Sequence, residues 1–85
     1  MKIVVTEVSG EGLESFLGKS IVLWCMNYIY TGTLVGVNAT CCKLSDASVV
    51  YETGGLSDAT WKDAQKLPSD WYVNLAAIES FGGGK

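Results

Sequence analysis

The sequence alternates between short apolar runs and brief stretches of turn-forming residues. Residues 21–26 are continuously apolar, which is typical of a strand buried on both faces. Further strands are predicted over residues 29–37 and 41–53, where apolar and β-branched residues recur. Tight turns at residues 27–28 and 38–40 separate these three strands. The middle of the chain therefore predicts consecutive antiparallel strands.

The amino-terminal part predicts a strand followed by a helical turn. Residues 1–9 are expected to form a short strand with two weakly apolar faces. Leu13, Phe16 and Leu17 stand at positions i, i+3 and i+4, which places them on one side of a helix of one or two turns. Gly18 follows, and a glycine there favours a left-handed end to the helix.

A polar excursion interrupts the strands between residues 54 and 70. Within it, Ser57 or Asp58 is expected to cap a short helix, and Pro68 is expected to end that helix. Trp61 would lie on one side of the helix. Covering the core is a more frequent role for such a tryptophan than an exposed contact.

The carboxy-terminal part predicts two more strands. Trp71, Val73 and Leu75 alternate with other residues, as expected for a fourth strand with one inward face. The doublet Ala76–Ala77 breaks this alternation, and residues 78–81 form the fifth strand. The break therefore predicts a sharp corner between the two strands.

These elements together predict an all-β fold: a small barrel of five short, curved strands with a short leading helix. Gly32 and Gly36 lie inside the second strand, where glycines often mark a bend or a close backbone approach. The third strand is expected to bend near Asp46. A single domain is predicted over residues 1–81, and the glycine-rich residues 82–85 are predicted to be a flexible tail.

A small barrel of this kind is expected to keep free strand edges, which must be blunted or paired. The last two strands carry only Asp70 and Glu79 as charged residues, so nothing there blocks pairing with a second chain. Pairing between different edges of neighbouring subunits is head-to-tail and closes into a ring. The residues predicted at this interface are Trp71, Tyr72, Val73, Leu75, Ile78 and Phe81.

Composition and charge bear on the partners of such a domain. Hydrophobic residues make up 48% of the 85 residues and charged residues only 18%, against a usual value of about 25% charged. A surplus of apolar surface favours self-association, although a well-filled core is the simpler explanation. The net charge of −3, with six basic residues that are all lysine, argues against binding of a polyanion by a single subunit.

Few residues have the chemistry for catalysis or metal binding. Cys25, Cys41 and Cys42 form no spaced pairs, so they are expected to be reduced thiols and not a disulfide framework or a zinc site. Because there is no histidine, the most common general base is missing, and neither enzyme activity nor a cofactor is expected. No apolar run is long enough to span a bilayer or to form a signal peptide, which predicts a cytoplasmic protein without a membrane partner.

Three segments resemble the first motif of the Sm family: residues 17–23 (LGKSIVL), 30–38 (YTGTLVGVN) and 44–47 (LSDA). In that family a helix ends in Gly-Lys, a strand follows, a G-x-L-x-G segment leads to an Asp, and Leu-x-Asp comes later. Residues 27–32 and 77–81 are also similar to small Sm-like proteins of marine phages. The resemblance implies a five-stranded bent barrel of the SH3 type, with a short leading helix, that assembles into a ring, in a bacterial or phage-infected host cell.

The resemblance also implies single-stranded RNA as a ligand. In Sm proteins, an Asp, an aromatic residue and an Asn in the loop after the second strand, with an Arg-Gly pair after the fourth, enclose a base. Asn38 occupies the position of the Asp, and Cys41 that of the base-reading Asn. The aromatic position falls on Ala39 or Thr40, and residues 74–77 contain no Arg-Gly pair. The scaffold motifs match, whereas the uridine pocket does not.

Other groups beside these loops are candidates for contact with nucleic acid. Lys43 would form a circle of positive charge in a ring, although a solvated strand residue is the simpler explanation. Asn38 is a pore contact or a turn residue that tolerates a left-handed backbone. Asn74 is a pore contact or an outward strand position. The predicted nucleic-acid-binding residues are Asn38, Thr40, Lys43 and Asn74.

Two functions of different classes follow from these observations. The first is a homo-oligomeric ring that binds single-stranded nucleic acid, RNA or DNA, weakly and with little sequence preference. The second is a structural or adaptor ring whose ligand is a protein. The acidic balance and the missing uridine pocket favour the second function, and the Sm-like motifs favour the first.

Overall fold

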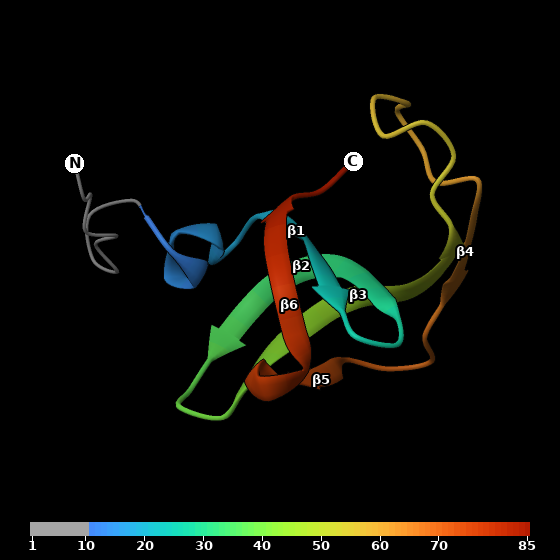
Figure 1. Cartoon of the computed structure of the whole chain (residues 1–85). Helices are drawn as coiled ribbons and strands as arrows, with labels where there is room; N and C mark the ends of the chain where they lie inside the picture. Colours follow the sequence, from blue (N-terminus) through green and yellow to red (C-terminus); the bar gives the residue numbers. More distant parts are fainter. Residues whose placement is uncertain (1–10) are drawn as a thin grey trace.

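The computed structural model describes residues 11–85, so the strand expected over residues 1–9 lies outside the described part. It contains six strands and two short 3-10 helices (Figure 1). In chain order the elements are η1 (Leu13–Phe16), β1 (Ser20–Cys25), β2 (Ile29–Val37), β3 (Cys41–Glu52), β4 (Asp63–Lys66), β5 (Trp71–Asn74), η2 (Leu75–Ala77) and β6 (Ile78–Gly83).

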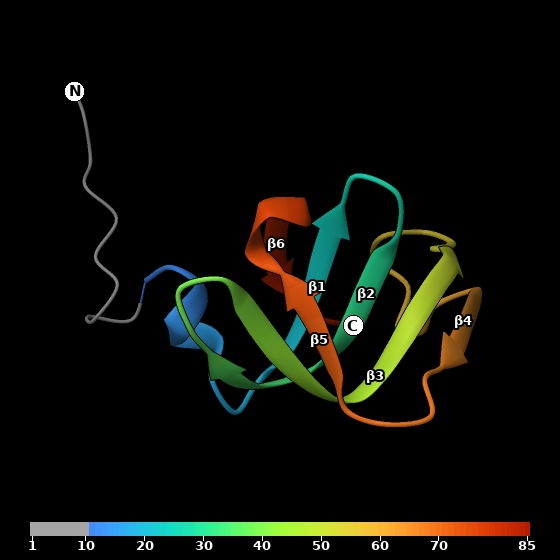
Figure 2. The same cartoon turned by 90° about the horizontal axis from the view of Figure 1, so that it is seen from below.

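The strands form one antiparallel sheet in the order β4-β3-β2-β1-β6, and β5 also pairs with β3. β5 pairs with the first part of β3, opposite Cys41 to Leu44, whereas β4 pairs with its last part, opposite Ser48 to Glu52. The three residues of η2 connect β5 directly to β6, which pairs with β1 (Figure 2). The sheet therefore curves round until its two margins are joined by this short corner.

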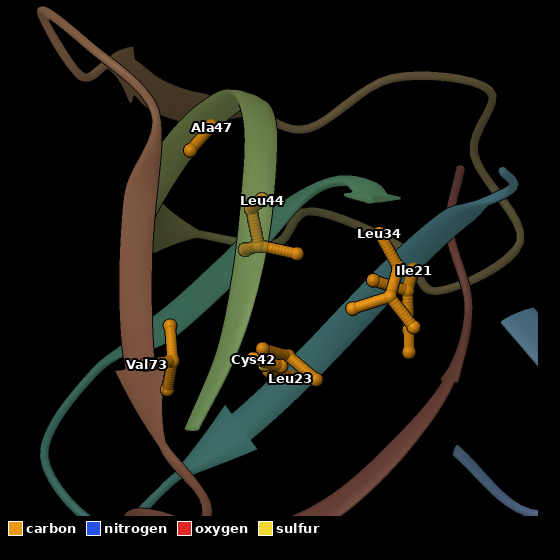
Figure 3. Packing of buried hydrophobic residues seen from close by; sticks show 7 residues of the cluster. All are labelled: Ile21, Leu23, Leu34, Cys42, Leu44, Ala47 and Val73. Carbon is orange, nitrogen blue, oxygen red and sulfur yellow. The ribbon is translucent and has the colours of Figure 1, made fainter. Parts of the chain in front are cut away.

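The inward side chains of this curved sheet make a single apolar core (Figure 3). Buried residues alternate along β1 and the first part of β3, as Ile21 and Leu23 or Cys42 and Leu44 show, because successive side chains of a strand face opposite sides of the sheet. On β1, Val22 is buried between Ile21 and Leu23, which confirms burial on both faces for residues 21–23. Trp24 and Cys25 are only half-buried, and Met26 lies beyond the strand and is exposed, so this part of the prediction is corrected. The buried cluster consists of Ile21, Leu23, Leu34, Cys42, Leu44, Ala47 and Val73.

A bend in β3 makes the curvature possible. Asp46 has a φ of 49° and is the one non-glycine residue in the left-handed region among residues 11–85, which confirms the bend predicted there. Gly32 of β2 lies against this bend, and a Cβ built on Gly32 would be 2.8 Å from the carbonyl oxygen of Ser45. The two backbones can approach this closely because glycine has no side chain.

The helical turn before the sheet is also confirmed. Leu13–Phe16 forms the 3-10 helix η1, and Gly18 has a φ of 82° just beyond it. The Gly18 N–H donates to the Leu34 carbonyl oxygen at 2.7 Å. Leu13 and Phe16 pack against the core cluster. The left-handed glycine thus turns the chain from the helix into β1, next to the middle of β2.

The helix predicted in the excursion is wrong. Residues 63–66 form β4, because the last part of β3 has a free margin whose backbone groups they satisfy. Asp58 caps no helix: its carboxylate accepts a hydrogen bond from the Gly55 N–H at 3.0 Å and closes a tight turn. Trp61 is not among the side chains that pack against the core, so its predicted role as a cover for the core is also corrected.

The predicted boundary between the last strand and a flexible tail is corrected as well. β6 continues to Gly83, because Gly82 and Gly83 pair with Val22 and Ile21 of β1. The next N–H, that of Gly84, donates to the Ser20 carbonyl oxygen at 3.2 Å. Glycine disfavours strands only by its conformational freedom, and here the exposed margin of β1 provides partners for its backbone.

Within residues 11–85, no helix has the length and apolar character needed to cross a membrane. The two helical elements are a 3-10 helix of four residues and one of three. A bilayer-spanning helix needs about 20 apolar residues. Neither helical element approaches that length.

We predict that Gly32→Ala destabilises the protein by about 1–3 kcal/mol, because the new Cβ would overlap the Ser45 carbonyl oxygen. Gly36→Ala is the matched control on the same strand, since its nearest neighbour would be the Lys43 Cβ at an ordinary 3.7 Å. Urea unfolding of both variants measures the difference. Equal stability of the two would show that β2 and β3 do not depend on this close approach.

Candidate functional site

Two loops that are far apart in the sequence meet at one end of the sheet. Asn38–Thr40 connects β2 to β3, and η2 connects β5 to β6. The Leu75 N–H donates to the Thr40 carbonyl oxygen at 2.9 Å, and Cys41 stands opposite Asn74 in the β3–β5 ladder. The structure therefore brings together three of the predicted nucleic-acid-binding residues, Asn38, Thr40 and Asn74.

Asn38 stabilises its own loop. Its Oδ1 accepts hydrogen bonds from the Thr40 N–H at 2.8 Å, the Thr40 hydroxyl at 3.2 Å and the Cys41 N–H at 2.8 Å. Its backbone N–H donates to the Cys41 carbonyl oxygen at 2.9 Å. Asn38 does not have a positive φ, so it acts through its side chain and not through a left-handed backbone. Its carbonyl oxygen is thus already engaged in the turn.

Lys43 lies on the outer face of the sheet beside this loop. It stands opposite Tyr72 in the β3–β5 ladder, and its Nζ is 5.6 Å from the centroid of the Tyr72 ring. The Asp70 carboxylate is 3.7 Å from the same Nζ, with both side chains well exposed. A hydrogen bond with Tyr72 is the main cause that raises the pKa of Lys43, and the charge of Asp70 adds to it. Lys43 therefore carries its positive charge at neutral pH.

The loop stands between two shallow hollows. One, of about 180 Å³, lies on the outer face and is lined by Gly36, Val37, Asn38, Cys41, Lys43 and Tyr72. The other, of about 460 Å³, lies on the side of η1 and is lined by Leu13, Glu14, Val37, Asn38, Ala39 and Leu75. The outer hollow is smaller than the roughly 300–1,000 Å³ typical of small-molecule pockets.

Tyr72 and Asp70 are site residues that the sequence reasoning assigned elsewhere. Tyr72 was expected at a subunit interface, which stays a prediction; its ring also lies beside the Lys43 ammonium and lines the outer hollow. Strand pairing explains the difference, since residues opposite each other in an antiparallel ladder have neighbouring side chains. The register between β3 and β5 was not predictable while the excursion before β5 was assigned to a helix.

The residues predicted at the subunit interface differ in exposure and fall into three groups. Tyr72 is 62% exposed and Phe81 is 41% exposed. Trp71, Leu75 and Ile78 are partly buried against the core. Val73 is 4% exposed and belongs to the core, so it could contribute to strand pairing with a neighbouring subunit only through its backbone. In the described part of the chain, β5 pairs with β3 alone and β6 with β1 alone, which leaves one edge of each strand open.

The three thiols are free, and two of them lie in apolar surroundings. Burial raises the pKa of the Cys42 thiol, and likewise that of Cys25, because the thiolate loses its solvation. Both groups are therefore protonated and weakly nucleophilic at neutral pH. Between residues 11 and 85, no three Cys, Asp or Glu side chains gather closely enough to hold a metal ion.

We predict that Asn38→Ala destabilises the protein by about 1 kcal/mol, because the loop loses the acceptor of three hydrogen bonds. Asn38→Asp keeps the acceptor oxygen and should retain stability. Thermal unfolding of the two variants, with amide exchange at Thr40 and Cys41, measures the effect. A loop that exchanges at the wild-type rate in Asn38→Ala would contradict the assignment of Asn38 to the turn.

Comparison with known proteins leaves the site to be interpreted from its own geometry. No family model, no curated protein and no solved structure matches this chain. The features of the molecule that bear on its function are the open strand edges, the two adjoining loops and the charges beside them.

Proposed function

We propose that the protein is an Sm-like binding protein, not an enzyme, which assembles into a ring and binds single-stranded nucleic acid with little sequence preference. The observation that carries the proposal is the pair of open edges on β5 and β6, two strands at opposite margins of one curved sheet. The Sm-like motifs in residues 17–47 supply the second argument.

The topology supports an Sm-like bent barrel. A leading helical turn is followed by strands of which the third is long and bent, and a 3-10 corner joins the last two. β4 and β5 pair with successive parts of β3 and together take the place of a single fourth strand, interrupted near Pro68. If β4 and β5 are counted as one strand, the sheet has five strands, which is the number expected for such a barrel.

The edges differ in what they offer to a second chain. β4 is exposed throughout and consists of Asp63, Ala64, Gln65 and Lys66, so charged and polar side chains blunt its margin. β5 and β6 carry Tyr72 and Phe81 as exposed large apolar residues and Glu79 as their one charge. Pairing of β5 with β6 of the next copy is thus the favoured contact.

Such pairing would be head-to-tail, because each copy contributes a different edge to each contact. When the same rotation relates each copy to the next and the rotations add up to a full turn, the copies close into a ring. The loop Asn38–Thr40 and the corner η2 adjoin β5, so they would recur once in every subunit at a fixed distance from the ring axis. A single Lys43 would then become a circle of ammonium groups.

Weak sequence preference follows from the groups that are free to bind. Phosphate contacts hold a strand without reading its bases, and Lys43 offers a point charge of this kind. Cys41 stands where the Sm family has its base-reading Asn, and the side-chain carbonyl oxygen of Asn38 is engaged in the turn. Tyr72, beside Lys43, supplies an aromatic ring that stacks on any base.

A protein ligand is the second candidate, and the pairing of Lys43 with Asp70 favours it. An ammonium group that already faces a carboxylate attracts phosphate less strongly, and the net charge of −3 per subunit repels a polyanion. In this case the ring would serve as an adaptor. The two functions differ in whether nucleic acid binds at low salt.

We predict that Phe81→Lys converts the oligomer to monomers, because a charge on the β6 edge blocks strand addition. Tyr51→Lys is the matched control, since Tyr51 is 58% exposed on β3, away from the two open edges. Native mass spectrometry reports the subunit number, and circular dichroism verifies the fold. A monomeric wild-type protein would refute the ring.

We predict that Lys43→Glu lowers the affinity for a single-stranded RNA oligonucleotide at low salt by more than about tenfold, and reduces the slope of affinity against salt concentration. Lys66→Glu is the control, because Lys66 is an equally charged, exposed residue on β4 that also pairs with a carboxylate. Fluorescence anisotropy at several salt concentrations measures both. Unchanged binding in Lys43→Glu removes Lys43 from the site, and absence of binding in the wild type favours the adaptor ring.

A further inference from the structure

Residues 53–61, where β3 ends and the excursion begins, surround the ammonium group of Lys85. These contacts have no part in the proposed ring. Its Nζ donates hydrogen bonds to the carbonyl oxygens of Thr53 at 2.7 Å, Gly55 at 2.8 Å and Thr60 at 3.3 Å. The same Nζ is 4.4 Å from the centroid of the Trp61 ring. The loop that follows β3 thus folds around this nitrogen from several sides.

The number and kind of these contacts match one chemical group. A primary ammonium has three N–H donors and no acceptor, and three carbonyl oxygens are supplied here. The aromatic face adds a cation–π contact. Lys62 and Lys66 are held differently, each by a single carboxylate on an exposed surface. The groups that contact the Lys85 Nζ are neutral, and Asp58 is an acidic residue that lines the hollow beside them.

A hollow lies between the excursion and the outer face of β1 and β6. It measures about 320 Å³, and Val22 and Trp24 of β1 and Leu56 and Trp61 of the excursion contribute to its lining. Lys85 also lines it. In Figure 1 the end of β6 and the excursion lie toward the same side of the sheet. The Lys85 side chain connects the end of β6 to the excursion, because its three acceptors belong to residues that lie 25 to 32 positions earlier in the chain.

We propose that residues 53–61 form a binding site for a primary alkylammonium group, which Lys85 occupies from within the same chain and so fastens the excursion to the end of β6. The site requires both the charge and the three N–H donors. Acetylation of Lys85 removes the charge and two of the donors, and therefore releases the excursion. The inference does not rest on ring formation or on nucleic-acid binding.

The first test compares Lys85→Met with Lys62→Met. Methionine retains most of the apolar stem but no donor, and Lys62 lies in the same excursion, paired with Glu52 at 3.4 Å. We expect amide exchange of residues 54–61 to become about tenfold faster in Lys85→Met and to stay within about twofold of wild type in Lys62→Met. The Trp61 indole resonance should shift in Lys85→Met alone. Wild-type exchange in Lys85→Met would overturn the proposal.

The second test restores the ligand from solution. In Lys85→Ala the ammonium site formed by residues 53–61 is expected to be vacant. Methylammonium chloride is then titrated into this variant, and amide exchange of residues 54–61 is followed. Sodium chloride at equal ionic strength and tetramethylammonium chloride are the controls, because the latter can contact an aromatic ring but has no N–H donor. Recovery with methylammonium alone supports the site. No recovery, or equal recovery with tetramethylammonium, overturns the assignment to the three carbonyl oxygens.

Discussion

The close approach of β2 and β3 at Gly32 is the constraint on which the rest of the structure depends. The Gly32 backbone meets the Ser45 carbonyl oxygen just where Asp46 takes a left-handed conformation, so β3 changes direction there. Because of this bend, one long strand has two differently directed halves. One half pairs with β4 and the other with β5. Without it, β5 could not be carried back by η2 toward β6 and β1.

The core follows from this curvature with few large side chains. Ile21, Leu23, Leu34 and Leu44 are all fully buried, and they come from three neighbouring strands. No buried side-chain nitrogen or oxygen in residues 11–85 lacks a hydrogen-bond partner. Apolar packing and backbone hydrogen bonds therefore stabilise the domain, and its charged groups stay at the surface, where their ion pairs contribute little.

Local sequence patterns predicted the strands best where apolar residues that pack in the core are bounded by turn-forming residues. The apolar core of β1, the bounds of β2, the bend at Asp46 and the existence of a corner at Ala76–Ala77 were all predictable from neighbouring residues. The corner begins one residue earlier than predicted, because Leu75 belongs to η2 and not to the fourth strand. β4 was not, because Asp63–Lys66 is exposed throughout and carries no apolar periodicity; only the free margin of β3 makes it a strand. The last two residues of β6 were missed for the same reason, since glycines give no pattern of their own.

The candidate site was predictable only in part. The meeting of the Asn38–Thr40 loop with η2 follows from strand order, whereas the engagement of Asn38 by its own turn and of Lys43 by Tyr72 and Asp70 depends on register. Charge pairing of this kind needs distances, which a linear pattern does not contain. The Lys85 contacts could not be predicted from local sequence patterns, because they join residues that are 25 to 32 positions apart in the chain.

The division of the fourth strand into β4 and β5 has an architectural consequence. Residues 67–70 separate the two pieces, and the piece next to the excursion does not contain the edge that would meet a neighbouring copy. Changes in the length or composition of residues 54–62 are therefore separated from β5 by β4 and residues 67–70, whereas the Lys85 contacts connect them to the end of β6. A peptide grafted into this loop would leave the β5 edge unaltered, and it would keep the attachment to β6 only if the carbonyl oxygens of Thr53, Gly55 and Thr60 stay in place.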